Sequence, residues 1–174
     1  EQLADLSECH SCVKCKYDLC PSCAKAEATG GGRKLSPGLW SEFWTSSPQS
    51  SVAGALNFIR GKKPTCTRVD PTINIKSKHQ PTRCGFGGAV NLGEAFVVRW
   101  SGLFQARQAG TYTFFLKSDD GSQLWLNDRL VVNNDGRHGA VEKCSMAQTL
   151  TKGLHALRVV FFEAGGEASC VVSV

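Results

Sequence analysis

Two aspartates, Asp119 and Asp120, stand side by side where a run of strand-forming residues ends, and Gly121 follows them. An unpaired ionised carboxylate is very costly in an apolar interior, so the pair is expected to project from a loop. Asp and Gly are favoured turn residues, and an Asp side chain can cap backbone amides. A turn explains one aspartate better than two, because adjacent like charges repel unless something neutralises them. Calcium, which takes carboxylate and carbonyl oxygens as ligands, would do so.

Short strands are predicted on both sides of the aspartate pair and must position it. The runs 111–117, 123–126 and 130–132 are rich in β-branched, aromatic and leucine residues, and Asn127-Asp128 marks a turn between the last two. Further runs of this kind lie at 95–100, 155–162 and 170–174. Because some of them are apolar on both faces, we expect an all-β, antiparallel β-sandwich with a covered outer face. The segments 51–59 and 60–93 are less periodic and are expected to form long loops around short strands.

Cysteine usage indicates an oxidising compartment. Nine cysteines occur in 174 residues, a density that is typical of disulfide frameworks in extracellular proteins. An odd number leaves one thiol free, or paired with another chain or with residues beyond this sequence. Cys66–Cys84 and Cys144–Cys170 are the expected pairs in the sandwich, because each closes a loop of modest length near a strand end. The other five are Cys9, Cys12, Cys15, Cys20 and Cys23.

Composition divides the chain into three parts. Residues 1–28 hold the five clustered cysteines and are interpreted as a small cysteine-rich disulfide module, too short to build a core of its own. A zinc site is conceivable for CxxC pairs, but the two outer pairs stand too close for a zinc ribbon, which has about 15–20 residues between pairs. Residues 29–35 predict a flexible, glycine-rich linker. Residues 36–174 form the predicted β-sandwich.

Six short sequence pieces follow one another through residues 36–174. They are Gly38-Leu39-Trp40-Ser41-Glu42-Phe43-Trp44, Asp70-Pro71-Thr72-Ile73, Arg99-Trp100-Ser101-Gly102-Leu103-Phe104, Gly110-Thr111-Tyr112-Thr113-Phe114, Ser118-Asp119-Asp120-Gly121-Ser122-Gln123-Leu124-Trp125, and Gly153-Leu154-His155-Ala156-Leu157-Arg158-Val159-Val160-Phe161-Phe162-Glu163. As an ordered set they resemble the anthrax protective antigen domain family, the PA-fourteen β-sandwich. The resemblance implies that residues 36–174 share this jelly-roll-type fold.

The resemblance also implies a calcium site. In the lectin members of that family, the fungal flocculins and adhesins, an aspartate pair joined by a cis peptide holds calcium, and the ion chelates sugar hydroxyls. Asp119 and Asp120 match that pair. Those lectins add an asparagine and backbone carbonyls from a loop after a late strand. Here Glu163 stands at the asparagine position, with the carbonyls of Gly165 and Glu167 just beyond it, and this departure puts sugar binding in question.

Three polar residues near the pair are candidates for the rim of a ligand site, namely Asn134, Asp135 and His138. The alternative is a polar turn with a histidine that packs against a strand. A lone His without a second His or Cys at metal spacing is a weak metal signal.

The four tryptophans give no sign of a sugar-stacking surface. Trp40, Trp44, Trp100 and Trp125 all lie in strand-like pieces. We expect them to pack in the core with satisfied indole N–H groups.

The net charge of +5 comes from one stretch. Residues 60–83 contain seven lysines and arginines against Asp70 alone. One interpretation is a solvated loop, and the other is a patch for an anionic glycan or an acidic partner. The candidate contact residues are Lys62, Lys63, Lys76 and Lys78.

These patterns predict an extracellular or cell-surface, lectin-like binding module that recognises carbohydrate with the help of calcium, in adhesion or attachment. The alternative is a structural or assembly domain of a larger protein or filament, joined to another chain through an unpaired cysteine. No nucleophile elbow, P-loop, zinc-protease or Rossmann motif occurs, and adjacent carboxylates cannot face each other across a glycosidic bond, so no enzymatic activity is expected. No apolar run approaches about 18 residues, so no membrane span is expected. No nucleic-acid partner is expected either. Because the sequence begins at Glu1, we expect any signal peptide to have been removed already.

Overall fold

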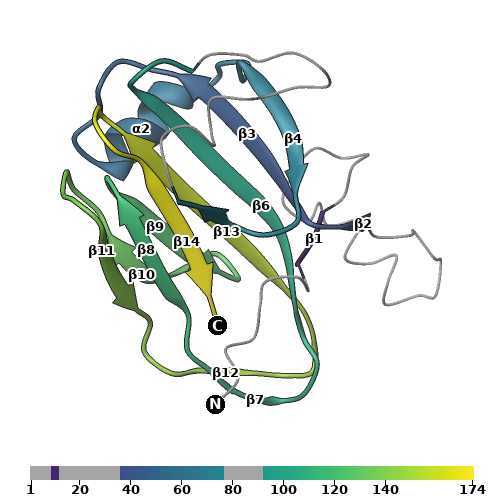
Figure 1. Ribbon diagram of the computed structural model, residues 1–174. Coiled ribbons are helices and arrows are strands. Elements are labelled where there is room, and N and C mark those ends of the chain that lie inside the picture. Colours follow the sequence, from purple (N-terminus) through teal and green to yellow (C-terminus); the bar gives the residue numbers. More distant parts are fainter. Residues whose placement is uncertain (1–8, 12–35, 77–91) are drawn as a thin grey trace.

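The computed structural model of the protein describes residues 9–11, 36–76 and 92–174, which form two antiparallel β-sheets that face each other (Figure 1). The smaller sheet has the order β11 (Val141–Cys144), β8 (Phe115–Asp119), β14 (Ser169–Ser173) and β5 (Asn74–Ile75). A separate ribbon pairs β7 (Gly110–Tyr112) with β12 (Gln148–Leu150). The larger sheet contains β1 (Cys9–Ser11), β2 (Ser36–Pro37), β3 (Leu39–Thr45), β4 (Cys66–Asp70), β6 (Phe96–Ala106), β9 (Ser122–Leu126), β10 (Arg129–Asn134) and β13 (Gly153–Glu163). The prediction of a mostly β, antiparallel sandwich is confirmed.

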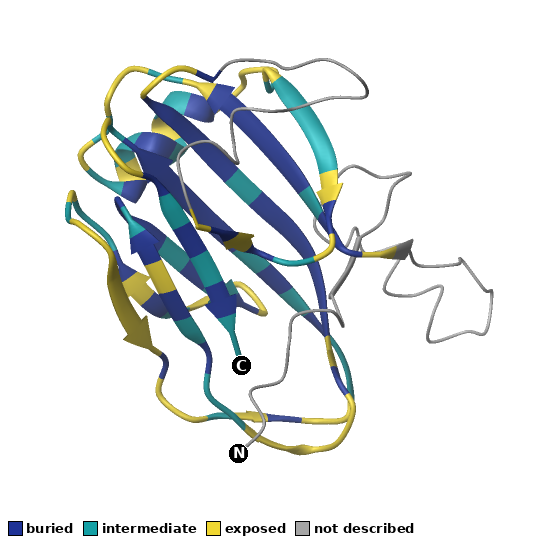
Figure 2. Ribbon diagram, in the orientation of Figure 1, coloured by how far each residue is buried: buried dark blue, intermediate teal, exposed yellow. Residues whose placement is uncertain are grey.

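The centre of the larger sheet is the pair β6 and β13. They match residue for residue from Gly153 opposite Ala106 to Glu163 opposite Phe96. Figure 2 shows β6 as almost continuously buried, whereas β13 mixes buried and intermediate residues over 153–158 and is buried from Val159 to Glu163. One face packs against the smaller sheet in a single core cluster that contains Phe96 and Phe161 of the larger sheet and Leu116 and Val172 of the smaller one. The rings of Phe96 and Phe161 meet edge to face across β6 and β13, with centroids 5.9 Å apart. The other face is covered by a helix, so these strands are apolar on both sides.

That helix, α2 (Val52–Ile59), overturns the expectation of a loop at 51–59. The Ser51 side chain accepts a hydrogen bond from the Gly54 amide at 3.1 Å and so caps the first turn. Val52, Ala55 and Ile59 lie on one face at helical spacing and are buried against the outer face of β6 and β13. Eight residues are too few to display that periodicity clearly, because a short helix derives its stability from tertiary packing.

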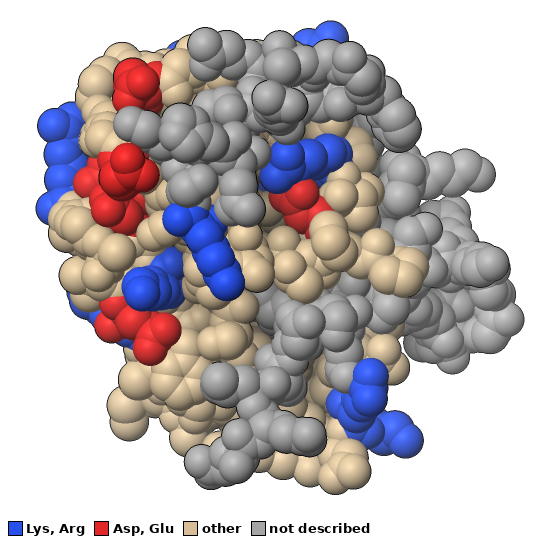
Figure 3. All heavy atoms as spheres, in the orientation of Figure 1, with Lys and Arg blue, Asp and Glu red and all other residues tan. Residues whose placement is uncertain are grey.

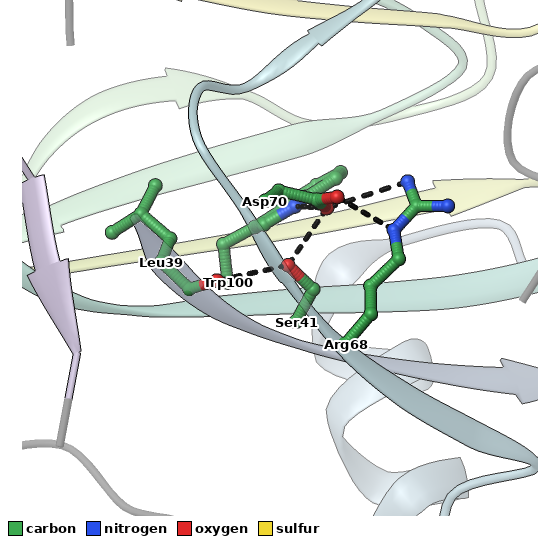
Figure 4. A network of polar contacts seen from close by, with 5 residues as sticks. All are labelled: Leu39, Ser41, Arg68, Asp70 and Trp100. Atoms are coloured by element: carbon green, nitrogen blue, oxygen red, sulfur yellow. Dashed lines mark hydrogen bonds and ion pairs between the residues drawn. The ribbon is translucent and has the colours of Figure 1, made fainter. Parts of the chain in front are cut away.

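A buried carboxylate fixes the edge strand β4 to its neighbours (Figure 4). Asp70 is only 9% exposed. It accepts hydrogen bonds from the Ser41 hydroxyl at 2.7 Å, from the Trp100 indole N–H at 2.8 Å and from Arg68 Nε at 2.6 Å. The cost of burying this charge is offset by three donors from β3, β6 and β4 itself. The Asp-Pro piece of the sequence therefore has a structural role.

The expected Cys144–Cys170 disulfide is wrong, because both residues are free thiols. Cys144 is exposed on β11, whereas Cys170 is buried on β14, and β8 lies between these two strands. Strands two positions apart in a sheet are separated by about 9.5 Å, beyond the roughly 7 Å that a disulfide spans between Cα atoms. Burial raises the pKa of the Cys170 thiol well above its usual range. Cys66 is disulfide-bonded, but its partner lies outside the described residues, so the Cys66–Cys84 pair stays a prediction.

The cysteine-rich segment contributes to the sandwich at one point. Its residues Cys9–Ser11, as β1, pair with β2 and with the end of β6. The rest of residues 1–28 and nearly all of the predicted linker lie outside the described residues, so the division at 28 and 35 stays a prediction. In the described part of the chain, no helix is long and apolar enough to cross a membrane.

Candidate functional site

Three carboxylates converge where the chain passes from the smaller sheet to the larger one. Asp119 ends β8 in the smaller sheet, and the chain then passes through Asp120 and Gly121 into β9 of the larger sheet. Glu163 ends β13, which pairs with β9. One carboxylate oxygen from each of Asp119, Asp120 and Glu163 lies within 4.8 Å of the others. The Asp119–Asp120 peptide is cis, the arrangement that the resemblance implied for the pair.

Backbone amides orient two of the three carboxylates. Asp120 accepts hydrogen bonds from the amide of His138 at one oxygen and from that of Ala164 at the other, both at 3.0 Å. Glu163 accepts one from the Gly165 amide at 2.7 Å through Oε1. Its other oxygen, Oε2, is buried and has no hydrogen-bond partner among the residues that the structure describes. A buried acceptor without a partner is costly, and a bound cation would satisfy it.

The carboxylates are held in an environment that opposes their charge. Glu163 is 1% exposed and Asp120 is 7% exposed. Burial, together with the nearby charges of Asp120 and Asp119, raises the pKa of Glu163 to about 7. Burial and the charge of Asp120 also raise the pKa of Asp119. The charge of Asp120 therefore opposes ionisation of both Asp119 and Glu163, and a divalent cation would remove that conflict.

Gly121 permits the close approach that brings the carboxylates together. A Cβ atom at this position would lie 2.5 Å from Cε1 of Phe162 and 2.6 Å from the carbonyl oxygen of Gly136. The carbonyl of Gly121 accepts a hydrogen bond from the Phe162 amide at 3.0 Å. Only a residue without a side chain fits between β13 and the 136 turn while making this bond.

The loop after β13 carries the other two predicted ligands. Gly165 and Glu167 are exposed, and Gly165 has a positive φ of 130°. The charge of Glu167 contributes to the raised pKa of Asp119, so it is close enough to influence the site. The loop leaves these residues open to solvent next to the buried carboxylates.

The three predicted rim residues have different surroundings. Asn134 is fully buried, and its amide donates to the Val141 carbonyl at 2.9 Å and to the Ser118 hydroxyl at 3.1 Å. Asp135 accepts from the Val52 amide at 2.7 Å, so it caps α2. His138 is partly exposed and, through its amide, holds Asp120. Of the three, His138 alone joins the carboxylate cluster directly, and the other two connect structural elements.

The four predicted patch lysines do not share one element. Lys62 and Lys63 lie in the connection between α2 and β4, whereas Lys76 follows β5 in the other sheet. Lys78 lies outside the described residues. A four-lysine patch stays a prediction.

Two of the four tryptophans depart from the expected core position. Trp44 and Trp100 are buried as expected, but Trp40 and Trp125 are only half-buried. Trp125 packs against the Arg158 guanidinium, 4.9 Å from the ring centroid. Trp40 shares the outer face of β3 with Glu42 and Trp44, a feature that the period-two pattern of residues 39–45 would have revealed.

Comparisons with known proteins agree with this architecture. A sequence profile described as PA14 domain matches residues 35–174. A solved structure titled "PA14 sugar-binding domain from RTX adhesin" has a TM-score of 0.69 and 23% identity, over 78% of this chain and 88% of that one. The A domain of Epithelial Adhesin 9 from Candida glabrata, solved in complex with Galβ1-4GlcNAc, has a TM-score of 0.59 and 13% identity, over 79% and 80% of the two chains. At these identities the likeness is one of fold.

A curated relative extends the comparison to a protein of another kind. Anti-sigma-I factor RsgI3 of Acetivibrio thermocellus is 35% identical over 49 residues, which is 28% of this chain and 8% of that protein. The chain thus matches a small part of a much longer relative. Domains of this kind therefore occur both in adhesins and in an anti-sigma factor.

Proposed function

The chain belongs to the PA14 domain family, and we propose that it is a binding module in which calcium, held by Asp119, Asp120 and Glu163, recognises carbohydrate. The observation that carries the proposal is the convergence of two buried carboxylates and one half-buried carboxylate, with one oxygen that has no hydrogen-bond partner among the described residues. Calcium takes six to eight oxygen ligands. Three carboxylates and the carbonyls of the exposed loop at Gly165 and Glu167 would supply part of that shell.

The remaining coordination positions are the reason for proposing a sugar ligand. Neighbouring hydroxyl groups of a sugar are hard oxygen donors and would complete the shell of an ion that the protein does not enclose. The two adhesin domains with this fold are a sugar-binding domain and a complex with Galβ1-4GlcNAc, according to their titles. By analogy, we place this chain among carbohydrate-binding modules of the cell surface or extracellular space.

Glu163 favours neutral sugars at this site. Three carboxylates around a divalent cation leave a net negative charge, whereas the asparagine of the lectins in this family would leave neutrality. A negative field repels acidic sugars and tolerates neutral diols. We therefore expect hexoses with adjacent free hydroxyls to bind, and sialylated or sulfated glycans not to bind here.

The alternative is an assembly module, and the exposed thiol of Cys144 on the edge strand β11 favours it. Calcium would then stabilise the carboxylate cluster without touching a ligand. Non-reducing electrophoresis of the parent and of a Cys144→Ser variant distinguishes a disulfide-linked assembly from a monomeric binding module.

The test of the proposed function is calcium titration by calorimetry, followed by a glycan array in calcium and in chelator. We expect the parent to bind calcium and Asp119→Asn to lose most of that affinity. Glu142→Gln, which removes an exposed carboxylate on β11, is the matched control and should bind calcium as the parent does. No heat of calcium binding by the parent would refute the metal site, whereas calcium binding without any glycan signal would support the assembly module.

A further inference from the structure

A second concave site lies on the opposite side of β3 from the core. It is a groove of about 1080 Å³ between the outer face of β3 and β6, the helix α2, and the connection that leads from α2 to β4. Its lining includes Trp40, Glu42, Arg99, Arg60, Lys62 and Lys63. The carboxylate cluster contributes no residue to this lining, so the groove is separate from the site described above.

Hydrogen bonds hold the wall of the groove in place. The Trp44 indole N–H donates to the Lys62 carbonyl at 3.2 Å. The Thr65 amide donates to the Phe43 carbonyl at 2.8 Å, and the Thr45 amide donates to the Thr65 hydroxyl at 3.1 Å. The connection is therefore fastened to β3 at Lys62 and Thr65, and the groove exists before any ligand arrives.

The groove presents donors and positive charge. Four cationic side chains line it, against the single carboxylate of Glu42. That carboxylate is already paired, because Arg99 donates to it through Nε at 2.8 Å and through Nη2 at 2.5 Å. Arg60 and Lys63 are exposed. A concave surface with this excess of one sign concentrates anionic ligands.

The groove also contains an aromatic side chain, Trp40, whose indole N–H makes no hydrogen bond with the described residues. Trp40 is half-buried, and its indole N–H is shielded from solvent without any hydrogen-bond partner. Tryptophan N–H groups usually find a partner when buried, so this one is an exception that a ligand acceptor would relieve. Trp44 lies beside it under the Arg99 guanidinium, 5.5 Å from its ring centroid.

The excess of positive charge in this groove is not repeated on the face of the molecule shown in Figure 3. On the face shown in Figure 3, lysine and arginine side chains alternate with aspartate and glutamate in the described part of the surface. Such a mixed surface has no strong field of one sign. The cationic groove thus differs in charge from this face of the molecule.

We propose that this groove binds a segment of an acidic polysaccharide. A sugar ring would pack on the indole of Trp40, and its carboxylate or sulfate groups would meet Arg99, Arg60 and Lys63. An aromatic floor suits the apolar face of a pyranose ring, and a guanidinium held by Glu42 offers its remaining N–H groups in a fixed direction. The groove would therefore take acidic glycans, the class that the calcium site repels.

The test uses the whole chain in EDTA, so that the calcium site contributes nothing. Calorimetric titration with an oligogalacturonate and with a heparin octasaccharide separates carboxylate from sulfate ligands, and a neutral maltohexaose is the ligand control. Arg60→Gln combined with Lys63→Gln removes two exposed rim charges. Lys117→Gln combined with Lys143→Gln removes the same charge from two exposed positions of β8 and β11 and is the matched control.

We expect at least one acidic oligosaccharide to bind, and its affinity to fall about tenfold or more in the Arg60, Lys63 variant, as loss of a charge-assisted contact predicts. The Lys117, Lys143 control should change the affinity less than about twofold, because exposed charges outside the contact are screened. Trp40→Ala should weaken binding, whereas Trp40→Phe, which keeps an aromatic face, should retain more of it. If Trp40→Ala fails to fold, the variant with Arg60→Gln and Lys63→Gln still tests whether the groove binds the oligosaccharide, because both residues are exposed.

Three results would overturn the proposal. The first is absence of binding by both acidic oligosaccharides. The second is an equal loss in the rim and control variants, which would mean a diffuse electrostatic attraction without a site. The third is binding of a polyglutamate peptide that is as tight as that of the glycans and depends on the same residues, which would identify an acidic protein segment as the occupant.

Discussion

Replacing Glu163 by glutamine should make the calcium-free protein more stable at high pH and should weaken its binding of calcium. The pKa of Glu163 rises from its usual 4.5 to about 7 in the folded protein, because of burial and the charges of Asp120 and Asp119. A carboxyl whose pKa is raised by folding contributes its full stability below the unfolded value and loses it as pH rises through the folded value. In chelator, the parent should therefore become less stable between about pH 5 and pH 8.

The magnitude follows from the shift. A change from 4.5 to about 7, at about 1.4 kcal/mol per pH unit, corresponds to a loss of up to about 3 kcal/mol of unfolding free energy. Glu163→Gln carries no charge to neutralise and should lose less stability over the same interval. In EDTA at pH 8, the variant should be more stable than the parent. Saturating calcium should reverse that order, since a ligand that binds only the folded state stabilises it by mass action.

The assay is urea denaturation of parent and variant at pH 5, 6, 7 and 8, in EDTA and in calcium. Glu142→Gln is the control, because Glu142 is exposed on β11 and should follow the parent throughout. The reasoning would fail if, in EDTA, the stability of the parent were flat from pH 5 to pH 8. It would also fail if Glu163→Gln lost stability in parallel with the parent.

Three further changes test other parts of the structure. Gly121→Ala should destabilise the fold by about 1–3 kcal/mol and weaken calcium binding, because the added methyl group overlaps the Phe162 ring; unchanged calorimetric affinity and melting temperature would contradict this. Asp70→Ala should destabilise the fold by about 1–3 kcal/mol for each of the two buried donors, Ser41 and Trp100, that it leaves without this acceptor, whereas Asp70→Asn, which keeps the side-chain shape, should cost less by urea denaturation. In the native protein, a thiol reagent should label Cys144 and spare Cys170 until the protein unfolds, and rapid native labelling of Cys170 would show that β14 opens readily.

The aspartate pair could be located from sequence because its chemistry is local. Two adjacent carboxylates followed by glycine predict the end of a strand, and β8 does end at Asp119. The expectation that both would project from a loop is wrong for Asp120, which is 7% exposed and accepts hydrogen bonds from backbone amides, and the cation stays a prediction. The two-residue turn at Asn127 and Asp128 was equally local, and both residues have positive φ, as a tight hairpin requires. Such features depend on neighbours in sequence, which the sequence shows directly.

The predictions that were wrong concern residues whose surroundings are set by segments distant in the sequence. Cys144 and Cys170 looked like a pair until the strand order placed β8 between them. Asn134 looked like a surface residue because the strand was expected to end at 132. In the structure β10 continues through Asn134, so this residue falls on the same buried face as Val132. Strand order and strand length are set by the packing of the whole sheet, and no single segment reveals them.

The two proposed sites would divide glycans by charge. Loaded with calcium, the carboxylate cluster keeps a net negative charge and faces its ligand with open coordination positions. The groove beside α2 has the opposite sign and offers cationic hydrogen-bond donors around a tryptophan. One β-sandwich can contain both proposed sites because the long strand β6 reaches each of them. Its N-terminal end pairs with Glu163 at the calcium site, and Arg99, three residues further on, lies in the groove. A polysaccharide that alternates neutral and acidic sugars would then meet complementary surfaces on a single domain, with calcium controlling one contact and ionic strength the other.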